Sequence, residues 1–133
     1  MTVPKTVPAI SEAESRVMEV LWHRAPLASE DIVSALDKAS SWHEKTIRTL
    51  LNRLLRKGAV SAEREGRRYL YSPVLTREQW QSHESRSLLD RVFGGKVAPL
   101  LVHFGRNEKL SAKDLAELRK MVEQLEKKER RRD

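Results

Sequence analysis

The sequence contains no cysteine, which excludes disulfides, thiol nucleophiles and thiolate metal sites. It has no apolar run near the roughly 20 residues of a membrane span. Residues 1–8 lack the apolar core of a signal peptide. Glycine-rich phosphate loops and the HExxH and GxSxG motifs are also absent. We therefore expect a cytoplasmic protein that is not an enzyme, has no cofactor and does not insert into a membrane.

Histidine is scarce as well, and no two histidines have the spacing of metal ligands on one helix. The four are His23, His43, His83 and His103. Scattered histidines of this kind are usually surface or packing residues, so we expect no metal site. His43 stands apart, because it precedes a basic segment where it could contact a phosphate.

Positive charge is what the chain has in excess. There are 26 Lys and Arg against 19 Asp and Glu, a net charge of +7, and the isoelectric point is about 10.0. A small basic protein tends to bind nucleic acid or an anionic membrane surface, although such a charge can also serve solubility alone. With 39% hydrophobic and 34% charged residues, the composition favours a folded helical protein.

Apolar spacing in the first half predicts three helices and a hairpin. Capping boxes open the first helix at Ser11 and the third at Ser41, the second begins at residues 27–29, and Gly58 ends the third. The residues expected to face the core are Val17, Met18, Leu21, Trp22, Ile32, Val33, Leu36, Ile47, Leu50, Leu51, Leu54 and Leu55. Two extended segments, residues 60–64 and 68–72, then read as a β-hairpin.

The second half is predicted to be helical, with helices over 76–93, near 97–104 and from Leu110. Leu115, Leu118, Val122 and Leu125 follow the 3-4-3 spacing of a narrow seam between paired helices. Such a seam could pack within its own chain. A dimer contact is favoured, because a short helical appendage has little core of its own.

The fold class we predict is mostly α: an N-terminal winged helix-turn-helix, made of three helices and a β-hairpin wing, with a C-terminal three-helix dimerisation region. The predicted boundaries are a flexible arm at 1–9, a DNA-binding domain at 10–74, a dimerisation domain at 75–128 and a frayed basic tail at 129–133.

The third predicted helix is the main candidate for function. At 100° per residue its leucines share one face, and cations, hydroxyls and an amide occupy the other. Residues 45–68 hold eight Lys or Arg and two Asp or Glu, which is +6 of the chain's +7. Such groups can bind base edges and phosphates in a major groove. The candidate DNA-binding residues are His43, Lys45, Thr46, Arg48, Thr49, Asn52, Arg53, Arg67, Arg68 and Tyr69.

An amphipathic helix with a solvated basic face is the simpler interpretation. The preceding helix and break, and the hairpin after it, favour a recognition helix with a wing. A different class also remains open: a winged-helix nucleic-acid-binding or scaffold protein with no specific operator. An aromatic content of only 5% argues against the stacking platforms of RNA binders.

Several motifs in order resemble the penicillinase-repressor family, and within it the BlaI/MecI branch. The run KTIRTLLNRL at residues 45–54, followed by Lys57 and Gly58, resembles the family's signature. Further resemblances lie at residues 10–14, 17–22, 68–73, 93–95 and 104–110. The similarity thus extends over nearly the whole chain.

This resemblance implies a homodimeric repressor that binds two-fold symmetric operators with TACA/TGTA-like half-sites, upstream of β-lactamase or related antibiotic-resistance genes. It implies that Lys45, Thr46, Arg48 and Thr49 contact DNA from the recognition helix, and that Arg53 and the wing residues contact the DNA backbone. The dimerisation residues we expect are Leu88, Val92, Leu100, Leu101, Phe104, Leu115, Leu118, Val122 and Leu125.

Two departures from the family pattern concern the inducing signal. The copper-responsive branch uses a cysteine-rich hook, which a chain without cysteine cannot form. In the β-lactamase branch a membrane sensor-protease system triggers cleavage at an Asn-Phe bond. The matching pair here is His103-Phe104, so this pair is the candidate regulatory cleavage site and the sensor system a candidate partner, with the asparagine replaced.

Overall fold

The computed structural model describes residues 7–39 and 42–132. Most of the expected flexible arm and the predicted cap Ser41 lie outside the described residues. Contacts divide the chain into two compact units, the first ending at Ser85 and the second beginning at Arg86.

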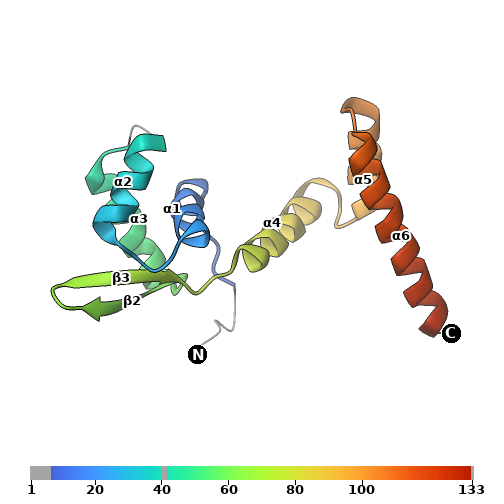
Figure 1. Ribbon diagram of the computed structural model, residues 1–133. Helices are drawn as coiled ribbons and strands as arrows, with labels where there is room; N and C mark the ends of the chain where they lie inside the picture. Colours follow the sequence, from blue (N-terminus) through green and yellow to red (C-terminus); the bar gives the residue numbers. More distant parts are fainter. Residues whose placement is uncertain (1–6, 40–41, 133) are drawn as a thin grey trace. The chain divides into compact units, whose positions relative to one another are not determined.

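Three helices form most of the first unit: α1 (Glu12–His23), α2 (Ser29–Ala39) and α3 (Glu44–Lys57), as Figure 1 shows. The capping box predicted for α1 is confirmed. The Ser11 hydroxyl accepts from the Glu14 amide at 3.0 Å, and the Ser11 amide donates to Glu14 Oε1 at 2.8 Å. These two bonds satisfy amides that the first helical turn leaves without a partner.

Glycine ends α3 as predicted. Gly58 has φ 78°, the left-handed conformation that glycine adopts most easily, and its N–H donates to the carbonyls of Leu54 and Leu55. At the other end, His43 is the N-cap, with extended backbone and no side-chain capping bond.

The sheet has three antiparallel strands in the order β1-β3-β2, namely β1 (Leu27–Ala28), β2 (Val60–Glu65) and β3 (Arg68–Pro73). The hairpin of β2 and β3 is confirmed. Residues 27–28 were expected to lead into the second helix with Ser29 as its cap, but they form a strand that pairs with Tyr71 and Leu70, and Ser29 is the first residue of α2. Two residues are too few to show a strand period, and both are buried, so tertiary packing decides their conformation.

The hydrophobic core of the first unit is built from all three helices. Nine of the predicted residues are in it, namely Val17, Met18, Leu21, Ile32, Leu36, Ile47, Leu50, Leu51 and Leu54. Trp22 and Val33 are partly buried against it. Leu55 was expected to face inward but is 38% exposed, because it lies at the edge of the apolar arc of α3.

A core residue not predicted from the sequence is Leu75, which is fully buried. The indole N–H of Trp22 donates to its carbonyl at 2.8 Å, and the rings of Trp22 and Trp80 lie 5.4 Å apart. Arg77 lies over Trp22 and forms an ion pair with Glu19 at 2.5 Å. These contacts join the start of α4 (Arg77–Val92) to α1.

Helix α4 (Arg77–Val92) begins in the first unit and ends in the second, which continues with α5 (Val97–Asn107) and α6 (Ala112–Arg132). The tail expected to be frayed from 129 is helical through Arg132. Lys, Glu and Arg are good helix formers. Three arginines in the last turn also complement the negative end of the helix dipole.

Candidate functional site

Helix α3 separates its side chains as the sequence predicts. Four apolar residues of the helix are buried in the core. The opposite side is exposed and carries Lys45, Thr46, Thr49, Asn52, Arg53 and Arg56. Cationic, hydroxyl and amide groups therefore line one continuous helix face that is open to a partner, with the chemistry needed to contact base edges and phosphates.

Two residues of this face are held by local hydrogen bonds. The Thr49 hydroxyl donates to the Lys45 carbonyl one turn earlier at 2.9 Å, so its methyl group and its acceptor lone pair remain for other contacts. Arg48 is half-buried, and its guanidinium contacts Glu44 and Ser29. The sequence identified Arg48 as a contact residue, and the spacing of four residues from Glu44 could have indicated the ion pair. Ser29 lies 19 residues away, and no local pattern indicates it as a partner.

The turn before α3 contains Trp42 and His43. Trp42 is partly buried against the core, and the Arg16 guanidinium lies 5.5 Å from its ring centroid. Packing is therefore the role that the structure gives to Trp42. His43 is exposed next to the start of α3, where a ring nitrogen is accessible to a partner.

The wing is the hairpin of β2 and β3. Gly66 is the first central residue of the turn between the two strands, and its φ is 63°. A positive φ at this position is common in two-residue hairpin turns. Arg67 and Arg68 are exposed, and Tyr69 is 51% exposed. The register places Arg68 opposite Glu65, so part of the wing's positive charge is offset across the strands.

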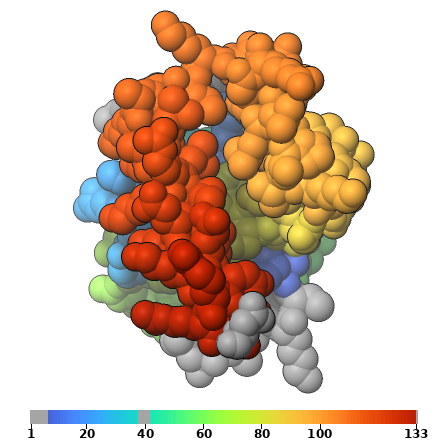
Figure 2. Space-filling view, turned by 90° about the vertical axis from the view of Figure 1, so that its right-hand side faces the viewer, coloured from blue at the N-terminus to red at the C-terminus, as the bar shows by residue number. Residues whose placement is uncertain are grey.

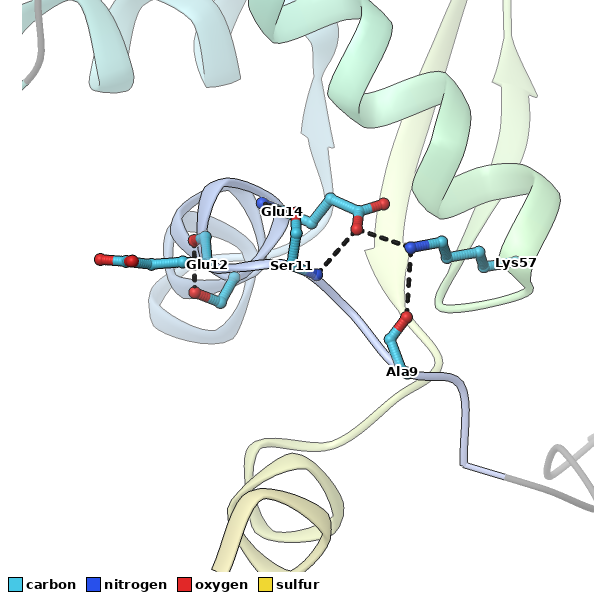
Figure 3. Close-up of polar contacts among 6 residues, drawn as sticks. Ala9, Ser11, Glu12, Glu14 and Lys57 are labelled. Atoms are coloured by element: carbon cyan, nitrogen blue, oxygen red, sulfur yellow. Dashed lines mark hydrogen bonds and ion pairs between the residues drawn. The ribbon is translucent and has the colours of Figure 1, made fainter. Parts of the chain in front are cut away.

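Lys57 belongs to the basic segment of residues 45–68. In the structure it forms an ion pair with Glu14. Its ammonium donates to Glu14 Oε1 at 2.6 Å and to the Ala9 carbonyl at 3.1 Å, as Figure 3 shows. Burial alone would raise the pKa of Glu14, but the bonds from Lys57 and Ser11 and the charge of Lys57 outweigh it. The pKa of Glu14 therefore lies below its ordinary value, and its carboxylate remains charged at neutral pH.

The second unit offers a different kind of surface. From Arg86 to Arg132, Leu89 is the only buried residue, and neither α5 nor α6 buries any. Figure 2 shows one face of α6, in red, at the surface. The predicted dimerisation residues that are exposed are Leu88, Val92, Leu101, Phe104, Leu115, Val122 and Leu125. Leu100 and Leu118 are half-buried.

His103 and Phe104, the candidate cleavage pair, lie within α5. The Asn107 side chain donates to the His103 carbonyl at 2.9 Å, and Phe104 is 44% exposed. Among the described residues, no three His, Asp or Glu side chains gather as metal ligands would. None of the helices in residues 7–39 and 42–132 is long and apolar enough to span a membrane.

Comparison with known families identifies this architecture. Residues 10–124 match the sequence model of the Penicillinase repressor family. The chain belongs to the penicillinase repressor family. The resemblance found in the sequence, including the BlaI/MecI branch, is thereby confirmed.

Relatives with this family's names cover almost the whole chain. The penicillinase repressor of Bacillus licheniformis is 34% identical over 90% of this chain and 94% of its own length. The penicillinase repressor of Staphylococcus aureus is 30% identical over 90% of this chain and 94% of its own length. The methicillin resistance regulatory protein MecI of Staphylococcus aureus is 27% identical over 85% and 92%.

Two solved structures that carry the name BlaI are similar to more than half of this chain. The DNA-binding domain of the repressor BlaI in solution has a TM-score of 0.52 and 39% identity, covering 56% of this chain and 92% of that domain. Monomeric Bacillus licheniformis BlaI in complex with the blaP half-operator has a TM-score of 0.50 and 38% identity, covering 56% and 90%. The winged-helix fold predicted from the sequence is confirmed.

Proposed function

We propose that this protein is a homodimeric transcriptional repressor that binds two-fold symmetric operator DNA, with TACA/TGTA-like half-sites, upstream of resistance-related genes. The observation that carries the proposal is the likeness of its first unit to BlaI in complex with a half-operator. The exposed basic face of α3 supports it, because that face has the groups that read a major groove. Such a protein acts in the cytoplasm, as a binding protein and not as an enzyme.

In this proposal the recognition helix α3 enters the major groove. The residues that contact base edges are Lys45, Thr46, Arg48, Thr49 and Asn52. Phosphates are contacted by Arg53 and His43, and by the wing through Arg67, Arg68 and Tyr69. Base contacts select the sequence, whereas phosphate contacts fix the orientation of the protein on the duplex.

Dimerisation supplies the symmetry of the operator. We assign DNA binding to residues 10–74 and dimerisation to residues 75–128. The exposed apolar side chains of α5 and α6 support this assignment, because a second copy would cover them. A two-fold dimer then places two recognition helices on half-sites about one helical turn, or a multiple of it, apart.

A competition binding experiment tests the proposal. The full chain is titrated against the intergenic DNA upstream of its own gene, with shuffled DNA of equal composition and single-stranded RNA as competitors. We expect preference for the upstream DNA and a steep fall of affinity with salt. Lys45→Ala should weaken operator binding, whereas Lys113→Ala, an exposed lysine of α6, should not. Equal affinity for all three nucleic acids would favour a non-specific binding or scaffold protein.

The inducing signal has its own test. If a membrane sensor-protease system acts on this repressor, a β-lactam should produce a shortened chain cut at the bond between His103 and Phe104. Immunoblots of treated cells, read beside transcription of the regulated gene, measure this. Induced transcription with an intact repressor would exclude cleavage as the trigger.

A further inference from the structure

Arg48 is half-buried at the flank of the exposed α3 face, and a neighbouring carboxylate holds its guanidinium. Its Nε donates to Glu44 Oε1 at 2.9 Å, and its Nη2 lies 2.8 Å from the same oxygen. Its Nη1 donates to the hydroxyl of Ser29, the first residue of α2, at 3.0 Å. The guanidinium is thus fixed from two sides, by its own helix and by the helix before it.

The other cations of the face differ from Arg48. Within the described residues, no ion pair or side-chain hydrogen bond holds Lys45, Arg53 or Arg56, and all three are exposed. These side chains can therefore change conformation to bind phosphates of any DNA sequence. Arg48 can present only the N–H groups that Glu44 and Ser29 leave unused, and Glu44 offsets part of its charge, since the two side chains are 42% and 62% exposed.

We propose that Glu44 and Ser29 are positioning residues that set DNA specificity through Arg48. Glu44 offsets the charge of Arg48, which removes it from general phosphate attraction. Ser29 fixes the plane of the guanidinium, so that its remaining donors can bond only an acceptor at one place. Arg48 then adds to discrimination between sequences and little to affinity for DNA in general. The inference rests on the proposed function as an operator-binding repressor.

The salt dependence of binding distinguishes contacts to phosphates from contacts that select the DNA sequence. Each phosphate neutralised by a cation adds about 0.9 to the slope of log K against log salt for duplex DNA. Glu44→Gln frees one cation, so the slope should steepen by about 0.9, shuffled DNA should bind several-fold tighter, and the operator-to-shuffled ratio should fall. Arg48→Ala should lower the same ratio and leave the slope almost unchanged.

Ser29 is tested by a conservative pair of variants. Ser29→Ala removes the hydroxyl without changing any charge, so the slope should stay the same while the operator-to-shuffled ratio falls. Ser29→Thr retains a hydroxyl and should restore the ratio. A merely structural effect of Ser29 would change thermal stability instead, which a melting curve of each variant measures.

Glu12→Gln is the matched control. Glu12 lies in the first turn of α1, as Glu44 does in α3, and it pairs with the arginine four residues on at 3.9 Å, with its side chain 89% exposed. The control removes the same charge by the same chemistry from a helix without the recognition face. The slope of log K against log salt and the operator-to-shuffled affinity ratio of this variant should equal those of the unaltered protein.

The experiment uses the full chain, the upstream intergenic DNA and shuffled DNA over a series of salt concentrations. Equal slopes for Glu44→Gln and Glu12→Gln would overturn the inference, and so would a slope reduced by about 0.9 in Arg48→Ala. An effect of Glu44→Gln that persists in the Arg48→Ala background would show that Glu44 acts by itself. If the unaltered protein did not prefer the upstream DNA, the proposed function would fail, and this inference with it.

Discussion

Replacing Lys57 with methionine removes the cation that faces the Glu14 carboxylate. The Glu14 side chain is 2% exposed, and its Oε2 has no hydrogen-bond partner among the described residues. In the variant the carboxylate keeps the hydrogen bond that it accepts from the Ser11 amide. Breaking a buried ion pair by removing one partner costs about 3–5 kcal/mol. Because Lys57 is 37% exposed and partly screened by solvent, we expect a smaller effect than this, about 2–3 kcal/mol at pH 7.

Urea denaturation followed by tryptophan fluorescence measures this effect. All three tryptophans, Trp22, Trp42 and Trp80, lie in the first unit, so the signal reports its unfolding. Chain concentration is kept constant, because self-association shifts apparent stability. Lys45→Met is the control, since this exposed lysine of the same helix has no ion pair within the described residues, and its effect should stay within about 0.5 kcal/mol.

The decisive comparison is between the unfolding free energies of the unaltered protein and Lys57→Met at acid pH. The pKa of Glu14 in the folded protein lies below its ordinary value of 4.5, so the ion pair stabilises the fold above that pH and is lost as pH falls through the folded-state pKa. In Lys57→Met the buried carboxylate can take up a proton, which relieves the penalty. The difference between the two proteins should therefore shrink below pH 4.5. A difference under about 1 kcal/mol at pH 7, or one that persists in acid, would refute the reasoning.

Three further substitutions test other features. Trp22→Phe leaves a carbonyl of the buried core without its indole donor, and denaturation should show a loss of about 1–2 kcal/mol; no loss would mean that water replaces the donor. Gly58→Ala forces alanine to φ 78° and should cost about 1 kcal/mol, whereas Gly105→Ala, inside α5 with open space around it, should not destabilise. Val122→Glu should convert the dimer to monomers in sedimentation, whereas Gln124→Glu, which adds the same charge beside the seam, should not.

Features set by nearby residues could be predicted from the sequence. The Ser11 and Glu14 cap, the glycine that ends α3 and the hairpin turn at Gly66 each depend on residues within a few positions. The faces of α3 follow from the helical period alone. For these elements the conformation that nearby residues favour is also the one found in the folded protein, so the sequence pattern predicts it.

Contacts between distant residues could not be predicted in this way. Lys57 meets a carboxylate 43 residues away, Trp22 a carbonyl 53 residues away, and Arg48 a hydroxyl 19 residues away. A single sequence shows which groups could pair but not which ones the packing brings within 3 Å. The two-residue strand β1 was missed for the same reason, since its partner strand lies more than 40 positions later.

The lack of buried residues in α5 and α6 has a consequence for the order of the folding reaction. The first unit has its own core, so its folding is unimolecular and its rate should not depend on chain concentration. If α5 and α6 obtain their core only from a second copy, their folding is bimolecular and slows as the chain is diluted. A newly made chain would then carry a finished DNA-binding unit before its second half is complete.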